Sequence, residues 1–219
     1  MDKQTILKVI VGSQAHGLAG PDSDFDYRGV FIVPTRDILG INTGKIKNTH
    51  WIEGREDDTA WEVGHFLHMA TKCNPTILQT FLSPIEEMND DGKMIRDLFP
   101  YVWSSDYVRD AFIGYGLNQR KKFLEKKDGR PDKYATAYLR TLFNAYELLT
   151  TGTFTIRVAD TAVGETLKRF KAGNYNVGEV IDVCMDWEER VREAAKRCDK
   201  KADLGQVNAV LLKLRYKHW

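Results

Sequence analysis

Cysteine is scarce in this sequence of 219 residues, with three copies at Cys73, Cys184 and Cys198. The three lie far apart in the chain, and no two of them form a C-x-x-C pair. This spacing argues against a disulfide framework or a cysteine-based zinc site, and it predicts reduced thiols. No apolar run approaches the roughly 20 residues that a membrane helix needs, so the sequence predicts a cytoplasmic protein with no membrane partner.

Strong net charge and the familiar glycine-rich nucleotide motifs are also lacking. The formal net charge is +1, which gives no strong nucleic-acid footprint. The chain contains neither G-x-x-x-x-G-K-[S/T] nor G-x-G-x-x-G. Charge is nevertheless unevenly spread, because residues 1–100 are net acidic and residues 101–219 are net basic. Such a division suits metal ions in one half and phosphates in the other.

The hydrophobic pattern changes near residues 100–105. Before that point, short β-branched and aromatic segments predict strands, and one apolar stripe predicts a helix over 63–73. After it, nearly every periodic segment is helical in pattern. We therefore expect an α+β fold with two domains, a catalytic domain over 1–102 and a helical domain over 103–219. The strands are expected at 5–11, 24–33, 45–53 and 57–61, and the later helices at 105–127, 131–151, 162–172, 177–198 and 204–216.

The turn after the first predicted strand carries the pair Gly12-Ser13. Glycine lets a backbone approach a ligand closely, and a helix start exposes N–H groups that favour phosphate. Ser13 is the expected N-cap of a short helix over 14–18, and its hydroxyl could contact a β- or γ-phosphate. Gly-Ser also occurs in plain strand-to-helix turns, so the pair becomes specific only in combination with a second motif.

Eleven residues later the chain carries Asp24-Phe25-Asp26 at the start of the second predicted strand. Residues i and i+2 of a strand point to the same face, so Asp24 and Asp26 can converge on one site. Two such carboxylates could hold the Mg²⁺ ions of a two-metal phosphoryl transfer. A third carboxylate is expected from a neighbouring strand. Asp58 is favoured, Asp57 serves if the register slips by one residue, and Glu62 is the remaining alternative.

Matching cations occur in the helical half. Lys133, Ala137, Arg140 and Asn144 are spaced by four, three and four residues and should share one helix face. Lys133 and Arg140 would lie about 10 Å apart along the helix axis. If this face borders a cleft, the two cations could clamp a triphosphate; otherwise it is a solvated helix face.

Taken together, Gly-Ser, the Asp-x-Asp pair and a later strand carboxylate resemble the nucleotidyltransferases of the DNA polymerase beta superfamily. More narrowly, the chain resembles the bacterial and phage family of predicted nucleotidyltransferases associated with RNA repair. One departure is Gln79, where that pattern leads us to expect glutamate. The stretches that carry the resemblance are 12–18, 22–29, 74–79, 133–140, 147–152 and 171–175.

The resemblance implies a polymerase-beta-like domain with a mixed sheet, followed by a helical domain. It implies transfer of a nucleoside monophosphate from an NTP to an acceptor hydroxyl, with Mg²⁺ or alternatively Mn²⁺ as the cofactor. Asp24 and Asp26 would then hold both metals, and Asp58 the metal that activates the acceptor. Gly12 and Ser13 would hold the β- and γ-phosphates.

The acceptor is left open by the sequence. An RNA 3′ end is favoured, and the net-basic half permits it without requiring it. The alternative is an antitoxin-like or regulatory nucleotidyltransferase that binds or modifies a partner protein, as some small members of the superfamily do.

Overall fold

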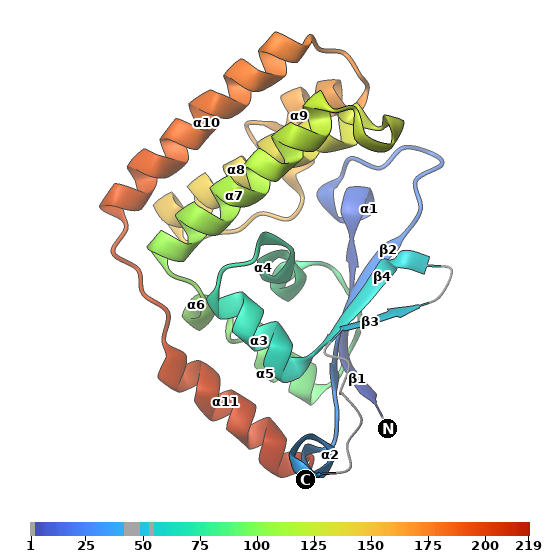
Figure 1. Cartoon of the computed structure of the whole chain (residues 1–219), viewed down its shortest axis with the longest axis vertical. Coiled ribbons are helices and arrows are strands. Elements are labelled where there is room, and N and C mark those ends of the chain that lie inside the picture. The colour runs from blue at the N-terminus through green and yellow to red at the C-terminus, as the bar shows by residue number, and fades with distance from the viewer. Residues whose placement is uncertain (1–2, 42–48, 53–54) are drawn as a thin grey trace.

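The computed structural model describes residues 3–41, 49–52 and 55–219, with only the backbone at 49–52 and 55–57. Two layers form the first half of the chain, a sheet and the helices that cover it, and a block of long helices follows (Figure 1). The expected α+β fold, with its mixed sheet and C-terminal helical region, is confirmed.

Five described strands form the sheet, in the order β3-β4-β2-β1-β5. β1 pairs antiparallel with β2 and β5, β3 pairs antiparallel with β4, and β2 and β4 run parallel. The parallel β2–β4 pair places a second strand directly beside the one that begins at the Asp-x-Asp pair. The strand bounds are Gln4–Val11 (β1), Asp26–Ile32 (β2), Thr49–Ile52 (β3), Arg55–Glu62 (β4) and Ile85–Met88 (β5).

Several short elements of this half differ from the sequence-based expectation. Most of the strand predicted at 45–53 lies outside the described residues, apart from β3. The strand β5 and the short helices α2, α4, α5 and α6 were not expected. β5 is missed because its two glutamates break the apolar pattern, and it lies exposed at the sheet edge. The helices of this half are Gly12–His16 (α1), Thr35–Leu39 (α2), Val63–Thr71 (α3), Pro75–Leu82 (α4), Asp90–Arg96 (α5) and Phe99–Val102 (α6).

The predicted long helices are all present, within three residues of the expected ends. Arg130 and Pro131 open α8 with proline in its first turn, where the missing N–H costs nothing. Gly152 ends it in the left-handed region, with φ of 72°. The helices of this half are Ser105–Leu124 (α7), Pro131–Thr151 (α8), Gly164–Lys171 (α9), Val177–Arg197 (α10) and Leu204–Lys217 (α11).

The last helix, α11, leaves the helical block and returns to the sheet layer (Figure 1). Arg215 on α11 forms a double ion pair with Glu62 at the end of β4, at 2.7 and 2.9 Å. Asp91 on α5 is paired with both Lys217 and His218. The division between residues 102 and 103 stays a prediction, and the structure adds that the final helix packs on the first half.

One continuous apolar core joins the two halves. It runs from β1 and β2 through α3 and α4 into α7, α8, α9 and α10. Phe81 of α4 packs against Phe99, which meets Phe154 beyond α8, at ring centroid distances of 6.1 and 6.2 Å. This packing fixes the helical block against the sheet layer. Within the described part of the chain, no helix combines the length and apolar character needed to span a membrane.

We predict that Glu62→Gln lowers the free energy of unfolding by about 3 kcal/mol, as expected for breaking a buried ion pair. The Glu62 side chain is 5% exposed and the Arg215 side chain 17% exposed, so the guanidinium would lose its carboxylate in a largely dry position. Glutamine still offers an oxygen to the Gly64 N–H that Glu62 caps, so the capping bond is preserved. Urea unfolding followed by circular dichroism measures the change.

The matched control is Asp186→Asn, which breaks an exposed ion pair with Arg190 one turn along α10. Exposed pairs of this kind contribute about 0.3–0.5 kcal/mol. Equal losses in the two variants would show that the Glu62–Arg215 contact does not anchor α11.

Candidate active site

The turn between β1 and α1 brings the chain against the first carboxylate. Val11, the last residue of β1, pairs with Asp26, the first residue of β2. Gly12 comes next with φ of 67°, and a Cβ added there would lie 2.1 Å from Oδ2 of Asp26. Both the left-handed conformation and this close approach require glycine. The helix α1 begins at Gly12 with Val11 as N-cap, so Ser13 lies in its first turn and is not the expected cap.

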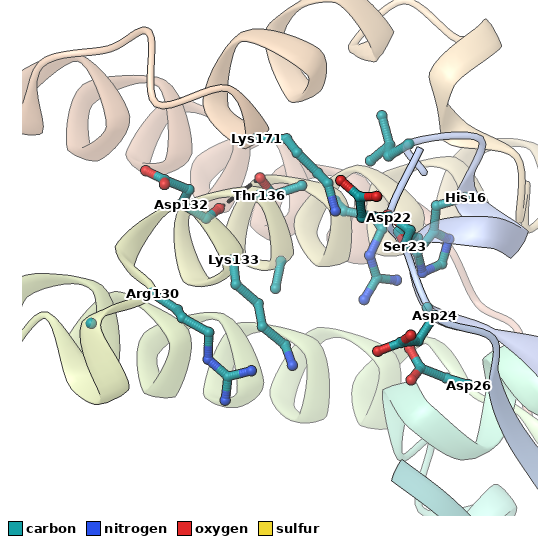
Figure 2. Close-up of a pocket in the computed structure, with 16 residues that line it drawn as sticks. His16, Asp22, Ser23, Asp24, Asp26, Arg130, Asp132, Lys133, Thr136 and Lys171 are labelled. Carbon is teal, nitrogen blue, oxygen red and sulfur yellow. Dashed lines mark hydrogen bonds between the residues drawn. The ribbon is translucent and has the colours of Figure 1, made fainter. Parts of the chain in front are cut away.

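Asp24 and Asp26 line the same cavity, which has a volume of about 510 Å³. Asp26 opens β2, whereas Asp24 lies in the loop before the strand and not on the strand as predicted. Both carboxylates nevertheless lie at one end of the cavity (Figure 2). The loop is held by the Gln14 amide, which donates to the Ser23 carbonyl at 2.9 Å. The two carboxylates therefore converge because a hydrogen-bonded loop places Asp24 beside the start of the strand, and not by strand alternation as predicted.

Cations form the opposite wall of this cavity. Lys133 and Arg140 line it from α8, as the helical spacing predicted, and Arg130 and Lys171 join them. Figure 2 shows Lys133 and Lys171 extending from their helices on the side opposite Asp24 and Asp26. Asn144, predicted on the same face, instead donates to the Thr155 carbonyl at 2.8 Å. The cavity thus has Asp24 and Asp26 at one end and four cations along the facing wall, and Asp22 and Asp132 also line it.

Arg140 is a half-buried cation with a neutral partner. Its guanidinium donates to Oε1 of Gln79 at 3.4 Å, and no carboxylate pairs with it among the described residues. Burial lowers the pKa of the Arg140 guanidinium, because the charged form has lost water. A half-buried guanidinium that lines a cavity favours binding of an anion, which would supply the missing countercharge.

His16, one turn after Gly12, completes a polar chain beneath the cavity. Burial, with a smaller contribution from the Arg140 charge, lowers the pKa of His16 to about 3, so the ring is neutral at physiological pH. Nδ1 lies 3.0 Å from the Ile156 carbonyl, which assigns the proton to that nitrogen. Nε2 is then an acceptor for the Gln79 amide at 3.4 Å. Gln79 is thereby oriented with its oxygen toward Arg140.

The site residues that sequence reasoning missed are His16, Arg130 and Lys171, and Gln79 was noted without a role. His16 comes three residues after the Gly-Ser pair, and this proximity was the available signal. Arg130 and Lys171 lie outside the α8 spacing that singled out Lys133. They reach the cavity from the start of α8 and the end of α9, which only the packed structure brings together.

Asp58, the favoured third carboxylate, is not brought to this cavity. Its Oδ1 accepts a hydrogen bond from the Tyr27 backbone N–H at 3.1 Å. It lines a different cavity, of about 240 Å³, together with Thr5, Lys8 and Tyr27. Since Asp26 and Tyr27 are successive residues of β2, their side chains point to opposite faces of the sheet.

The structure places one of the two alternatives for the third carboxylate, and the other lies outside the described side chains. Glu62 caps α3 and pairs with Arg215, away from the cavity. The side chain of Asp57 lies outside the described residues. Among the residues that the structure does describe, no three His, Cys, Asp or Glu side chains are grouped to hold a metal.

The chemistry of the donor set fits a hard divalent cation shared with a substrate. Magnesium prefers oxygen ligands and is commonly held by one or two carboxylates together with substrate phosphates. Asp24 and Asp26 provide two carboxylates at one end of a cavity whose other wall is cationic. A site with two protein carboxylates would hold the metal chiefly when phosphate oxygens supply further ligands. A closed cage of protein ligands, in contrast, holds a metal without the substrate.

Comparison with known proteins agrees with this geometry. A family model described as "RNA repair pathway DNA polymerase beta family" matches residues 2–171, a range that includes every residue of the cavity. An uncharacterized 38.9 kDa protein in the nrdC-mobD intergenic region of Enterobacteria phage T4 is 25% identical over 132 residues. That match covers 55% of this chain and 39% of the phage protein, so the chain spans well under half of this relative. The chain belongs to the RNA repair pathway DNA polymerase beta family and is thus a nucleotidyltransferase-type protein of the polymerase beta superfamily.

Proposed function

We propose that this protein transfers a nucleoside monophosphate from an NTP to an acceptor hydroxyl and releases pyrophosphate. The observation that carries the proposal is the charge arrangement of one cavity, with Asp24 and Asp26 at one end and four cations along the facing wall. Phosphoryl transfer is catalysed mainly by positioning and electrostatic stabilisation, and this cavity supplies groups for both.

In this proposal the chain's own residues bind and orient the triphosphate. Gly12 and Ser13 lie next to the β- and γ-phosphates, with the glycine leaving room at the backbone. Lys133, Arg140 and Lys171 bind the phosphate oxygens from the other side. The fixed Arg140 guanidinium can bind two oxygens at once and so orient the leaving pyrophosphate.

Mg²⁺, or alternatively Mn²⁺, would be held by Asp24, Asp26 and phosphate oxygens. When bound, such a metal supplies charge stabilisation at the transferring phosphoryl group and lowers the pKa of the acceptor hydroxyl. Asp58 stays a proposed third ligand, although it lines a different cavity from Asp24 and Asp26. In the arrangement described, Asp58 instead holds the residue after Asp26 in place.

We predict that Asp24→Asn combined with Asp26→Asn reduces nucleotidyl transfer by at least about 1,000-fold, because amides lack the charge that holds the metal. Release of pyrophosphate and transfer of ³²P from an α-labelled NTP measure the loss. Asp110→Asn, an exposed aspartate on α7 outside the cavity, is the control and should retain full activity. Transfer at the wild-type rate in the double variant would refute the assignment.

We predict that Arg140→Met lowers kcat/KM for the NTP by about 10- to 100-fold, the effect of losing charge-assisted hydrogen bonds. Folding stability should change little, because the half-buried guanidinium faces a neutral amide and methionine fills similar space. Steady-state kinetics and thermal unfolding together separate the two effects. Arg190→Met on the outer face of α10 is the control, and equal kinetic losses in both variants would contradict the proposal.

For the acceptor we propose the 3′ hydroxyl of RNA, supported by the RNA repair description of the family and the basic second half of the chain. The alternative is a partner protein. We expect ³²P from an α-labelled NTP to appear on RNA 3′ ends when RNA, DNA, small molecules and cell lysate are offered together. Label on a single polypeptide would instead identify a protein target.

A further inference from the structure

A second, smaller cavity of about 170 Å³ opens on the inner side of Asp26. It shares Gly12, His16, Lys133 and Arg140 with the larger cavity, so the two meet beside the candidate metal-binding carboxylate. We term the larger one the phosphate cavity and the smaller one the inner cavity. The residues that line the inner cavity alone come from β1, β2, α4, α7 and α8: Val11, Arg28, Thr76, Gln79, Tyr115, Gln119 and Tyr134.

Gln119 is the unexplained residue of the inner cavity. The residue is 4% exposed, and its side-chain amide makes no hydrogen bond within the part of the chain that the structure describes. The Gln119 amide is not among the described side-chain atoms that are fully buried without a hydrogen bond, so it opens onto the inner cavity. Gln79, across the same cavity, shows the usual situation, because its amide is bonded to both His16 and Arg140. The amide of Gln119 is therefore available for a ligand that enters this cavity.

The lining also restricts what the ligand can be. The described side chains that belong to the inner cavity alone include two glutamine amides, a threonine hydroxyl and two tyrosines, with Arg28 as the one charged group among them. Most of this part of the lining therefore consists of neutral groups that can form hydrogen bonds or stack on a ring. Pockets for whole drug-sized ligands measure about 300–1,000 Å³, so this volume accommodates one ring system. A glutamine amide offers both donors and an acceptor, as the edge of a nucleobase requires. Tyrosine rings such as that of Tyr115 are the usual surfaces on which bases stack.

We propose that the inner cavity is a nucleoside subsite in which Gln119 hydrogen-bonds the base. This inference rests on the proposed function, because the phosphate cavity beside it would hold the triphosphate. A base in the inner cavity would place its sugar near Asp26, where the two cavities meet. The nucleoside could belong to the donor NTP or to the end of an acceptor strand, and the experiment distinguishes them.

The test compares Gln119→Leu with the wild-type full chain by isothermal titration calorimetry in the presence of Mg²⁺. The ligands are α,β-methylene NTPs, inorganic tripolyphosphate and a short RNA with a free 3′ hydroxyl. If the donor base binds here, Gln119→Leu weakens the preferred NTP by about tenfold or more and leaves tripolyphosphate unchanged. If the acceptor base binds here, the RNA loses affinity and the NTP does not.

Thermal unfolding separates this role from a structural one. Replacing an amide that makes no hydrogen bond within the described protein by leucine should leave the stability of the free protein nearly unchanged, whereas a structural glutamine would cost stability. Asn118→Leu, at the neighbouring exposed position of α7, is the matched control and should change neither affinity.

Wild-type affinity of Gln119→Leu for the NTPs and the RNA would overturn the subsite while leaving the proposed function standing. The subsite would also be overturned if the wild-type protein bound each NTP no more tightly than tripolyphosphate, with RNA binding unaffected by the substitution. Failure of the proposed function looks different. In that case the wild-type protein binds no tripolyphosphate and releases no pyrophosphate, whatever residue stands at position 119.

Discussion

The contact between the Gly12 backbone and the Asp26 carboxylate is the constraint on which the site depends. The pairing of Val11 with Asp26 fixes the end of β1 against the start of β2. The space for a Cβ at position 12 is filled by the carboxylate itself. The turn proposed to receive phosphates and a carboxylate proposed to hold metal are therefore set relative to each other by backbone hydrogen bonds. Neither depends on a mobile side chain for its place.

The helical block adds the opposite charge and holds it rigidly. Arg140 is oriented by Gln79, which is oriented by neutral His16, whose other nitrogen is bonded to the chain beyond α8. These hydrogen bonds join α8 to α4, α4 to α1, and α1 to the segment after α8. The position of the Arg140 guanidinium therefore depends on how these elements pack together. Because His16 has a pKa of about 3, this chain of contacts keeps the same protonation across the physiological range.

Local patterns made much of this arrangement predictable. The spacing of Lys133 and Arg140 depends only on helix geometry, and both residues reach the same cavity. The face on which Asp58 lies depends on how β2 and β4 pair across thirty residues of chain, and the sequence contains no local signal for that register. His16 and Gln79 were equally hard to place, since buried polar networks arise where separate elements meet. Gln119 lies on α7, where nothing in the sequence distinguishes it from the solvated residues around it.

The return of α11 to the sheet layer has a mechanical consequence. The chain enters the helical block between α6 and α7 and leaves it between α10 and α11, so two covalent connections cross from one layer to the other (Figure 1). These crossings are bonded to each other, through Ser105 N–H to the Lys200 carbonyl at 3.0 Å and Asp203 N–H to the Tyr101 carbonyl at 2.8 Å. The two layers are therefore joined by a pair of covalent connections that are bonded to each other, in addition to the continuous apolar core between them.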